Sequence, residues 1–288
     1  MGLADLILSV VPYRLPPYLR QYEKGVTPLS TTPIVVGIIV AYLITIFGIQ
    51  AAMKPYQPYK LTFLFQVHNM FLSLGSGLLL ACMLEEVIPL LFNAGMFGAI
   101  CHTSSWTPRL EFYYIINYYF KYIELIDTIF LAIKKKPLAF LHVFHHSATA
   151  LLCYTQLDGR TSVSWVPITL NLGVHVLMYY YYWATAGGRK IWWKKYLTTM
   201  QITQFVIDLI AIYFSVWQRA AHEKWIPNIN LPHVADCAGT NAAAVFGMLL
   251  ISSYLLLFID FYLRTYKPAA SAKKGANGVA NGSIKRDL

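Results

Sequence analysis

The sequence predicts an all-α, multi-pass membrane protein with seven transmembrane helices. Of its 288 residues, 57% are hydrophobic and only 12% are charged, which is too apolar for a soluble domain of this size. Seven windows reach the roughly 20 apolar residues that span a bilayer. The Lys and Arg residues are also unevenly shared between the two sets of connections, as the insertion of a multi-pass protein requires.

The seven helices are expected in close succession from residue 33 onward. The first two windows, 33–52 and 61–84, and the last two, 196–217 and 241–263, are bounded by prolines, lysines or loop residues. Windows 110–133 and 138–156 contain ionisable residues, and 163–185 contains a run of tyrosines. Residues 33–264 thus form the predicted seven-helix membrane domain. Residues 1–32 precede it without a cleavable signal peptide, and the small, polar and Gly-rich residues 265–288 are expected to be disordered.

The basic residues predict the orientation. The tail and alternate connections hold most of them: Lys54, Lys60, Lys134, Lys135, Lys136, Arg189, Lys190, Lys194, Lys195 and Arg264, with further cations beyond. The positive-inside rule places this side in the cytosol and the N-terminus on the opposite side of the membrane. The Asn281-Gly-Ser sequon is then cytosolic, where glycosylation is not expected. The net charge of +10 therefore needs no nucleic acid, and the basic rim suits anionic headgroups or a phosphorylated substrate.

Polar residues within the windows recur at helical spacing and at one depth. They are Lys121, Glu124 and Asp127; His142, His145 and His146; Asn171, His175 and Tyr179; and Thr198, Gln201, Gln204 and Asp208. Counting about 1.5 Å per residue puts most of them in the cytosolic half of the bilayer. The short 134–138 turn should form a hairpin that brings Asp127 level with the histidines. These groups predict a cavity open to the cytosol, although hydrogen bonds between helices or a self-neutralising charge cluster would explain each group separately.

Three histidines within "HVFHH" admit metal or imidazole chemistry. Membrane di-iron desaturases and hydroxylases use such boxes, but they need several of them. This chain has eight histidines and one box, and His102, His222 and His233 are predicted on the far side. A lone zinc site lacks an evident ligand set. We therefore expect no metal and no cofactor, with imidazole acting as base or nucleophile.

The motifs "KYIELIDT", "HVFHH", "NLGVHVLMYYYY" and "TTMQITQ", together with His68–Asn69, resemble the signatures of the ELO family of very-long-chain fatty acid elongases. The stretch from His145 to Tyr182 is similar to the fungal branch that supplies sphingolipid and ceramide synthesis. The resemblance implies an acyltransferase, a 3-oxoacyl-CoA synthase of the endoplasmic reticulum membrane. It would condense a long-chain, saturated acyl-CoA with malonyl-CoA to 3-oxoacyl-CoA, CO₂ and CoA.

The resemblance also assigns roles to residues of the box and its neighbours. It implies that His145 carries the acyl group, while the other catalytic groups orient it, move protons or polarise the thioester: His142, His146, His175, Asp127, Glu124 and Asn171. Predicted substrate-binding residues are Lys121, Tyr181, Thr198, Gln201 and Gln204 near the thioester, and Lys134, Lys136, Lys194 and Arg264 for CoA. The rival nucleophile is the Cys153 thiol, about 10 Å deeper than His146 by helical rise.

The far side of the membrane should close the acyl tunnel. Gln218 or Arg219 would oppose a methyl terminus there, although Arg219 could simply extend its charge to the interface. Cys101 and Cys237 fall in the two longest far-side loops, and the oxidising lumen predicts a disulfide between them; two free thiols are the alternative. Lys285–Arg286 resembles a cytosolic dibasic retrieval signal.

Two other classes of protein remain open at this stage. One is a metal-dependent lipid desaturase or hydroxylase, and the other is a non-enzymatic seven-helix transporter or receptor, whose site would more typically lie at the midplane between repeats. The expected partners are the bilayer, acyl-CoA, malonyl-CoA and the ketoreductase, dehydratase and enoyl reductase of the elongation cycle, with homo-oligomerisation possible.

Overall fold

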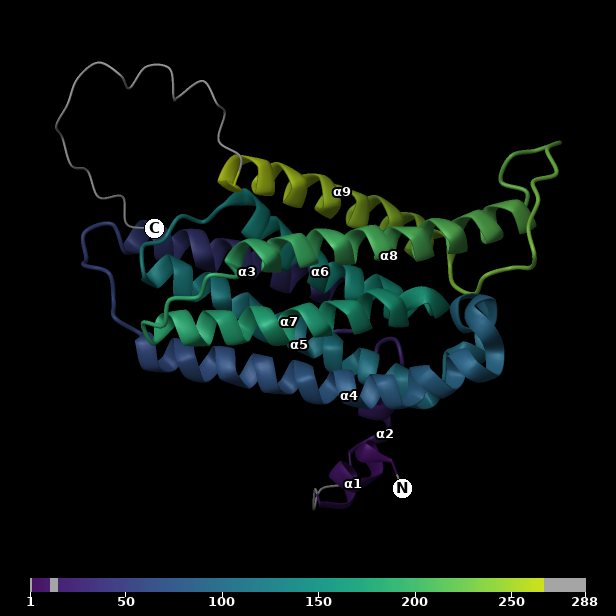
Figure 1. Ribbon diagram of the computed structural model, residues 1–288, viewed down its shortest axis with the longest axis horizontal. Coiled ribbons are helices and arrows are strands. Elements are labelled where there is room, and N and C mark those ends of the chain that lie inside the picture. The colour runs from purple at the N-terminus through teal and green to yellow at the C-terminus, as the bar shows by residue number, and fades with distance from the viewer. Residues whose placement is uncertain (1, 11–14, 267–288) are drawn as a thin grey trace.

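The computed structural model describes residues 2–10 and 15–266 as a bundle of long helices (Figure 1). The long helices are α3 Thr32–Ala52, α4 Thr62–Cys101, α5 Pro108–Ile133, α6 Phe140–Gly159, α7 Trp165–Ala186, α8 Lys194–His222 and α9 Asn241–Tyr266. The short helices α1 Leu3–Val10 and α2 Pro17–Arg20 precede them, and the 3₁₀ turns η1 Thr103–Ser105 and η2 Ser162–Ser164 lie in connections. No strand occurs in the described ranges, which confirms the all-α prediction.

Four of these helices, α3, α4, α8 and α9, are long and apolar enough to cross a membrane. Their outer faces carry exposed large side chains such as Ile44, Phe63, Ile210 and Leu256, as expected where the surroundings are lipid rather than water. Helices α5, α6 and α7 are of similar length but carry the ionisable residues of the motifs. The chain is therefore a multi-pass membrane protein with a polar interior.

Helix α4 corrects one predicted boundary. The window 61–84 was expected to end before a loop, but α4 runs to Cys101 through Pro89, with a kink at Gly95. Gly95 has φ of 66°, a left-handed conformation that glycine adopts without steric penalty, so the chain turns there and resumes its helix. Cys101 is consequently the last residue of a helix and not a loop residue, because the apolar turn Gly98–Cys101 is buried in the bundle.

The connections gather at two ends of the bundle. Helix α4 packs on α7, α5 on α6 and α8 on α9. At one end, Lys135 Nζ in the α5–α6 turn donates 3.0 Å hydrogen bonds to Lys54 O and Tyr56 O in the α3–α4 turn. At the other, Ala238 N in the α8–α9 loop donates to Cys101 O over 2.8 Å. The two ends are called here the basic end and the disulfide end.

The C-terminal predictions lie largely outside the described residues. Helix α9 continues to Tyr266, so residues 265–266 are helical and not part of the expected tail. The Asn281 sequon and the Lys285–Arg286 pair fall beyond the described part of the chain.

Candidate active site

Lys121 and Glu124 are the centre of a buried polar network between α5 and α7. Lys121 Nζ lies 2.9 Å from Glu124 Oε1 and 2.9 Å from Asn171 Oδ1. The Asn171 side-chain amide is 3.1 Å from His175 Nε2, and His175 Nδ1 is 3.3 Å from Glu124 Oε1. Helical spacing explains the closure of the network, because residues 121 and 124, and 171 and 175, lie one turn apart on facing helices.

The histidine box on α6 presents its three rings to different neighbours. His145 packs against the rings of Tyr254 and Phe258 on α9, with centroids 4.8 and 5.8 Å away. His146 lies next to His142, with centroids 4.4 Å apart. His142 Nε2 is 3.1 Å from Thr128 Oγ1 on α5, which also accepts a 2.7 Å hydrogen bond from Tyr42 OH on α3. The His142–Thr128 contact confirms the expected α5–α6 hairpin.

Asp127 belongs to a second network. Its Oδ1 lies 2.9 Å from His68 Nε2 on α4, and its Oδ2 accepts a 3.0 Å hydrogen bond from Tyr179 OH on α7. The structure therefore brings Asp127 to the level of the box, as expected, but bonds it to His68 and Tyr179 and not to a box histidine. The ring of Tyr179 touches that of His175, at 5.3 Å between centroids, which places the two networks side by side.

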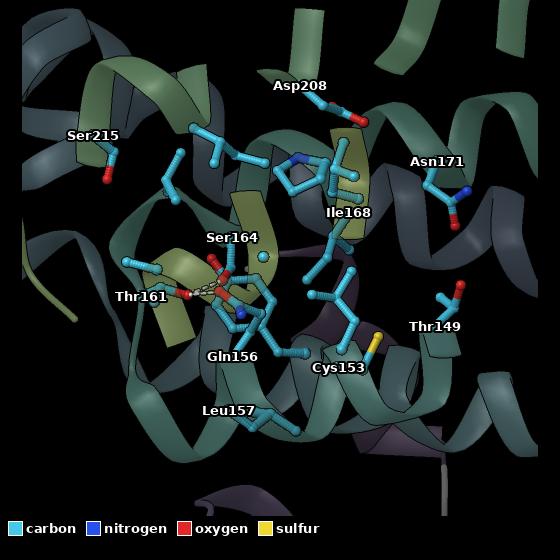
Figure 2. Close-up of a pocket in the computed structure, with 18 of the residues that line it drawn as sticks. Thr149, Cys153, Gln156, Leu157, Thr161, Ser164, Ile168, Asn171, Asp208 and Ser215 are labelled. Carbon is cyan, nitrogen blue, oxygen red and sulfur yellow. Dashed lines mark hydrogen bonds between the residues drawn. The ribbon is translucent and has the colours of Figure 1, made fainter. Parts of the chain in front are cut away.

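A cavity extends from these networks through the bundle (Figure 2). Lys121, His145 and Asn171 line it near the networks, and Arg219, Cys237 and Ala238 line it at the disulfide end. Apolar side chains form much of the wall between them: Leu152, Leu157, Ile168, Phe205, Ile212, Val216 and Ile251. The cavity thus joins the His145 imidazole to the closed, disulfide end of the molecule, with a lining that suits an alkyl chain.

The predicted substrate-binding residues divide into two groups. Gln204 lines the cavity, Gln201 Nε2 lies 3.5 Å from Met178 Sδ, Thr198 Oγ1 lies 3.5 Å from Tyr266 OH, and Tyr181 packs on Trp193. Lys136, Lys194 and Arg264 are exposed at the basic end, while Lys134 is held 3.7 Å over the Phe65 ring. The structure brings the first group to the interior and leaves the second on the rim.

The two free cysteines differ in their access to the cavity. Cys153 lines it, and its Sγ accepts a 3.7 Å hydrogen bond from the Asn117 amide. Cys82 is buried on α4 and is not part of the lining. The rival thiol nucleophile is therefore beside the cavity, deeper than the histidine box along α6.

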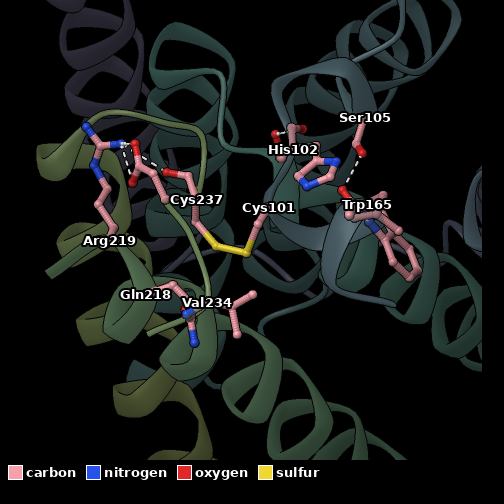
Figure 3. The surroundings of a disulfide bond; sticks show 12 residues. Cys101, His102, Ser105, Trp165, Gln218, Arg219, Val234 and Cys237 are labelled. Atoms are coloured by element: carbon pink, nitrogen blue, oxygen red, sulfur yellow. Dashed lines mark hydrogen bonds and ion pairs between the residues drawn. A yellow bond between two sulfur atoms is a disulfide. The ribbon is translucent and has the colours of Figure 1, made fainter. Parts of the chain in front are cut away.

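Cys101 and Cys237 are joined by a disulfide that closes the far end of the bundle (Figure 3). The Cα atoms are 4.0 Å apart, and 136 positions separate the two residues in the chain. Trp165 Nε1 donates to Ala99 O over 2.8 Å, and Ser162 Oγ donates to His102 O over 2.9 Å. The disulfide therefore sits in a hydrogen-bonded junction of α4, α7 and the α8–α9 loop.

Arg219 and Gln218, the predicted chain-length residues, point to different places. Arg219 lines the cavity, and its guanidinium is paired with Glu223 at 2.6 Å and donates to Cys237 O over 2.9 Å and to Asn241 Oδ1. Hydrogen bonds from Trp225 and Asn241 lower the pKa of Glu223, and the nearby Arg219 charge adds to the effect. Gln218 instead accepts from Val234 N over 2.8 Å and does not line the cavity.

Sequence reasoning missed three side chains of this interior. Tyr42 holds Thr128, Tyr254 covers His145, and Asn117 contacts Cys153. Tyr42 and Tyr254 are polar groups in the middle of two mostly apolar helices, and that position was the available signal. Asn117 lies one turn before Lys121 on the same face of α5, so helical spacing alone could have found it.

Within the described ranges, no group of three or more His, Cys, Asp or Glu side chains is arranged to hold a metal ion. Five histidines lie in the same region. His68, His142, His145 and His175 contact Asp127, Thr128, Tyr254 and Asn171 respectively, and His146 packs against the rings of His142 and His145.

Comparison with known proteins places this architecture in one family. Residues 27–274 match the family model described as "ELO: GNS1/SUR4 family". "Putative fatty acid elongase 1" of Schizosaccharomyces pombe is 48% identical over 267 residues, covering 92% of this chain and 79% of the relative. "Fatty acid elongase A" of Dictyostelium discoideum is 35% identical over 259 residues, covering 89% and 92%. The chain belongs to the ELO family of fatty acid elongases.

Proposed function

We propose that the protein is the condensing enzyme of very-long-chain fatty acid elongation. It joins a long-chain, saturated acyl-CoA with malonyl-CoA and releases 3-oxoacyl-CoA, CO₂ and CoA. One observation carries the proposal: the His145 imidazole lies at the head of a largely apolar cavity that it shares with Lys121 and Asn171 and that ends at the disulfide. An acyl chain in that cavity would present its thioester carbon to the imidazole.

The proposed reaction has two steps. In the first, an imidazole nitrogen of His145 attacks the thioester carbon, the C–S bond breaks, and CoA leaves as the thiol after taking up the imidazole proton. In the second, malonyl-CoA loses CO₂ to form an enolate, whose carbon attacks the acyl carbon. The bond to the His145 nitrogen breaks, and the imidazole takes up a proton from the solvent to regain its neutral form. Both steps place negative charge on carbonyl oxygens, which hydrogen-bond donors in a dry site stabilise strongly.

The Lys121 network supplies such donors. The contacts of Lys121 with Glu124 and Asn171 fix the position of its Nζ donor. We assign polarisation of the thioester carbonyl to this network and to His175. His142 and His146 orient His145 and move protons. Asp127 fixes the positions of His68 and Tyr179 beside these histidines.

The basic end is assigned to CoA. Lys134, Lys136, Lys194 and Arg264 surround this end, where their charges can pair with the CoA phosphates. Tyr181, Thr198, Gln201 and Gln204 lie between the rim and the cavity and would contact the pantetheine arm and the thioester.

The membrane placement follows from the same proposal. All seven long helices cross the bilayer of the endoplasmic reticulum within the domain 33–264, with the basic end in the cytosol, where CoA substrates occur, and residues 1–32 and the disulfide end in the lumen. The product serves sphingolipid and ceramide synthesis. The ketoreductase, dehydratase and enoyl reductase of the cycle act on it next, and copies of this chain are candidate partners.

The purified protein tests the proposal directly. Incubation with radiolabelled malonyl-CoA and stearoyl-CoA should give labelled 3-oxoacyl-CoA longer than the substrate, with release of CO₂. Omitting NADPH from this assay excludes the later, reductive steps of the cycle. Unchanged stearoyl-CoA, or a desaturated or hydroxylated product of unchanged length, would contradict condensation and favour the other classes of membrane protein.

A further inference from the structure

The cavity wall contains three buried oxygen atoms without a hydrogen-bond partner in the described chain. They are the hydroxyl of Tyr114, Oδ1 of Asn117 and Oδ1 of Asp208. Tyr114 and Asn117 lie one turn apart on α5 and are each 2% exposed, and Asp208 on α8 is 0% exposed. Buried polar groups in proteins are nearly always paired, so three exceptions around one cavity need an explanation.

The other polar residues of the wall show that pairing is the rule here. Thr149 Oγ1 donates to His145 O over 2.6 Å, and Gln156 Nε2 donates to Ala243 O over 2.9 Å. Thr161 and Ser164 are bonded to each other. Asp208 itself is half satisfied, because its Oδ2 accepts a 3.1 Å hydrogen bond from Gln204 Nε2 while Oδ1 receives none.

Asp208 lies between the two ends of the cavity. On α8 it is two turns beyond Gln201 and three turns before Arg219. In Figure 2 Asp208 lies between Asn171, which is near the Lys121 network, and Ser215 toward the disulfide end. A ligand that reaches from His145 to the disulfide end would therefore pass Asp208 partway along its length.

A plain alkyl chain in this position would leave the three oxygens unpaired in a dry environment, which is unfavourable. A ligand carboxylate would be repelled by Asp208 and has no hydrogen to offer Asn117 Oδ1. A hydroxyl group is neutral, small, and both donates and accepts, so it can pair with Asp208 or Asn117 and with Tyr114.

We propose that this cavity is a binding site for long-chain acyl groups that carry a hydroxyl partway along the chain, and that Asp208 selects these groups by accepting a hydrogen bond from the hydroxyl. The inference rests on the proposed function, since it names a substrate class for the same cavity. Asn117 and Tyr114 line the wall contributed by α5 and add two further polar groups to the lining.

A hydroxyl scan tests the proposal without catalysis. Stearoyl-CoA analogues with one hydroxyl moved stepwise along the chain are measured for displacement of a fluorescent acyl-CoA from the purified protein, with malonyl-CoA absent. The affinity of the wild type should peak at one interior hydroxyl position, about tenfold tighter than that of stearoyl-CoA, since one buried hydrogen bond is gained. Asp208→Asn, which keeps an acceptor oxygen, should retain the peak, and Asp208→Leu should abolish it.

Ser76→Ala is the matched control, because the Ser76 hydroxyl is also buried and unpartnered but does not line the cavity. It should leave the peak in place. Affinity that falls at every hydroxyl position in the wild type, or a peak that survives in Asp208→Leu, overturns the inference. An affinity maximum at one hydroxyl position in a protein without condensation activity would contradict the proposed function and not this inference, so the two failures are distinguishable.

Discussion

Lys121 and Glu124 form an ion pair 2.9 Å long in which both side chains are less than 5% exposed. Such a pair is not self-contained, because Lys121 also reaches Asn171 and Glu124 also reaches His175 on α7. The two charges neutralise each other, as expected for a self-neutralising charge cluster. Their contacts also link the motif on α5 to the motif on α7. Variants of these four residues can therefore test stability and the proposed catalytic role separately.

Removing one partner of this pair should destabilise the protein. Lys121→Met leaves Glu124 as a buried carboxylate with only His175 nearby, and the free energy of unfolding should fall by about 3–5 kcal/mol. The double variant Lys121→Met/Glu124→Leu should recover much of that loss but none of the elongation activity. Denaturant unfolding in detergent micelles measures the first effect and product formation the second. Wild-type stability in Lys121→Met would show that the pair contributes little.

His145 should form an acyl adduct during turnover. With acyl-CoA present and malonyl-CoA absent, intact-protein mass spectrometry should detect the acyl group on the wild type. His145→Ala should lose the adduct, and elongation should fall roughly a thousandfold or more. Cys153→Ala is the matched control, because that thiol lines the same cavity. An adduct that persists in His145→Ala and disappears in Cys153→Ala would assign the reaction to the thiol.

The cations of the basic end should affect binding more than turnover. Single changes of Lys134, Lys136, Lys194 or Arg264 to Ala should raise the Michaelis constant for CoA substrates about threefold to tenfold and make it less sensitive to salt, with little change in kcat. Lys24→Ala removes a cation that is paired with Asp158 at the opposite end and should leave the constant unchanged. Equal effects at the two ends would argue against a CoA site at the basic end.

The disulfide should persist in the native protein and contribute to its stability. Non-reducing peptide mapping should recover Cys101 and Cys237 in one linked species, and Cys101→Ser/Cys237→Ser should lower the free energy of unfolding by on the order of 4 kcal/mol, because the closed loop is long. Alkylation of both thiols in protein never exposed to reductant would contradict the bridge and the lumenal placement of that end.

Arg219 should limit the length of the acyl chain. Ser215 lines the cavity one turn closer to His145, so Ser215→Lys places a charge in the path of the methyl terminus and should shorten the products. Gln218→Ala should leave the product lengths unchanged, because Gln218 bonds to Val234 outside the cavity. Mass spectrometry of the products measures their chain lengths. An unaltered length distribution in Ser215→Lys would contradict a chain-length limit at this end of the cavity.

The sequence by itself determined the helical class, the approximate limits of the long helices and the residues that gather inside. Periodicity and apolar length are local properties, so the 108–133 and 140–159 helices and the hairpin that joins them followed from residue spacing alone. Helix α4 exceeds the window 61–84 because Glu85 and Glu86 interrupt the apolar run, while the helix itself continues past them to the buried turn Gly98–Cys101.

Only the tertiary structure decided which polar groups pair. Spacing placed Asp127 on the face of Lys121 and Glu124, yet His68 and Tyr179 from other helices bind it. Spacing likewise offered Gln218 and Arg219 equally, and the rotation of α8 turned Arg219 to the cavity and Gln218 to the loop. Side-chain partners across helices depend on the rotation and offset of each helix against its neighbours, and these are set by packing of the whole bundle and not by the order of residues within one helix.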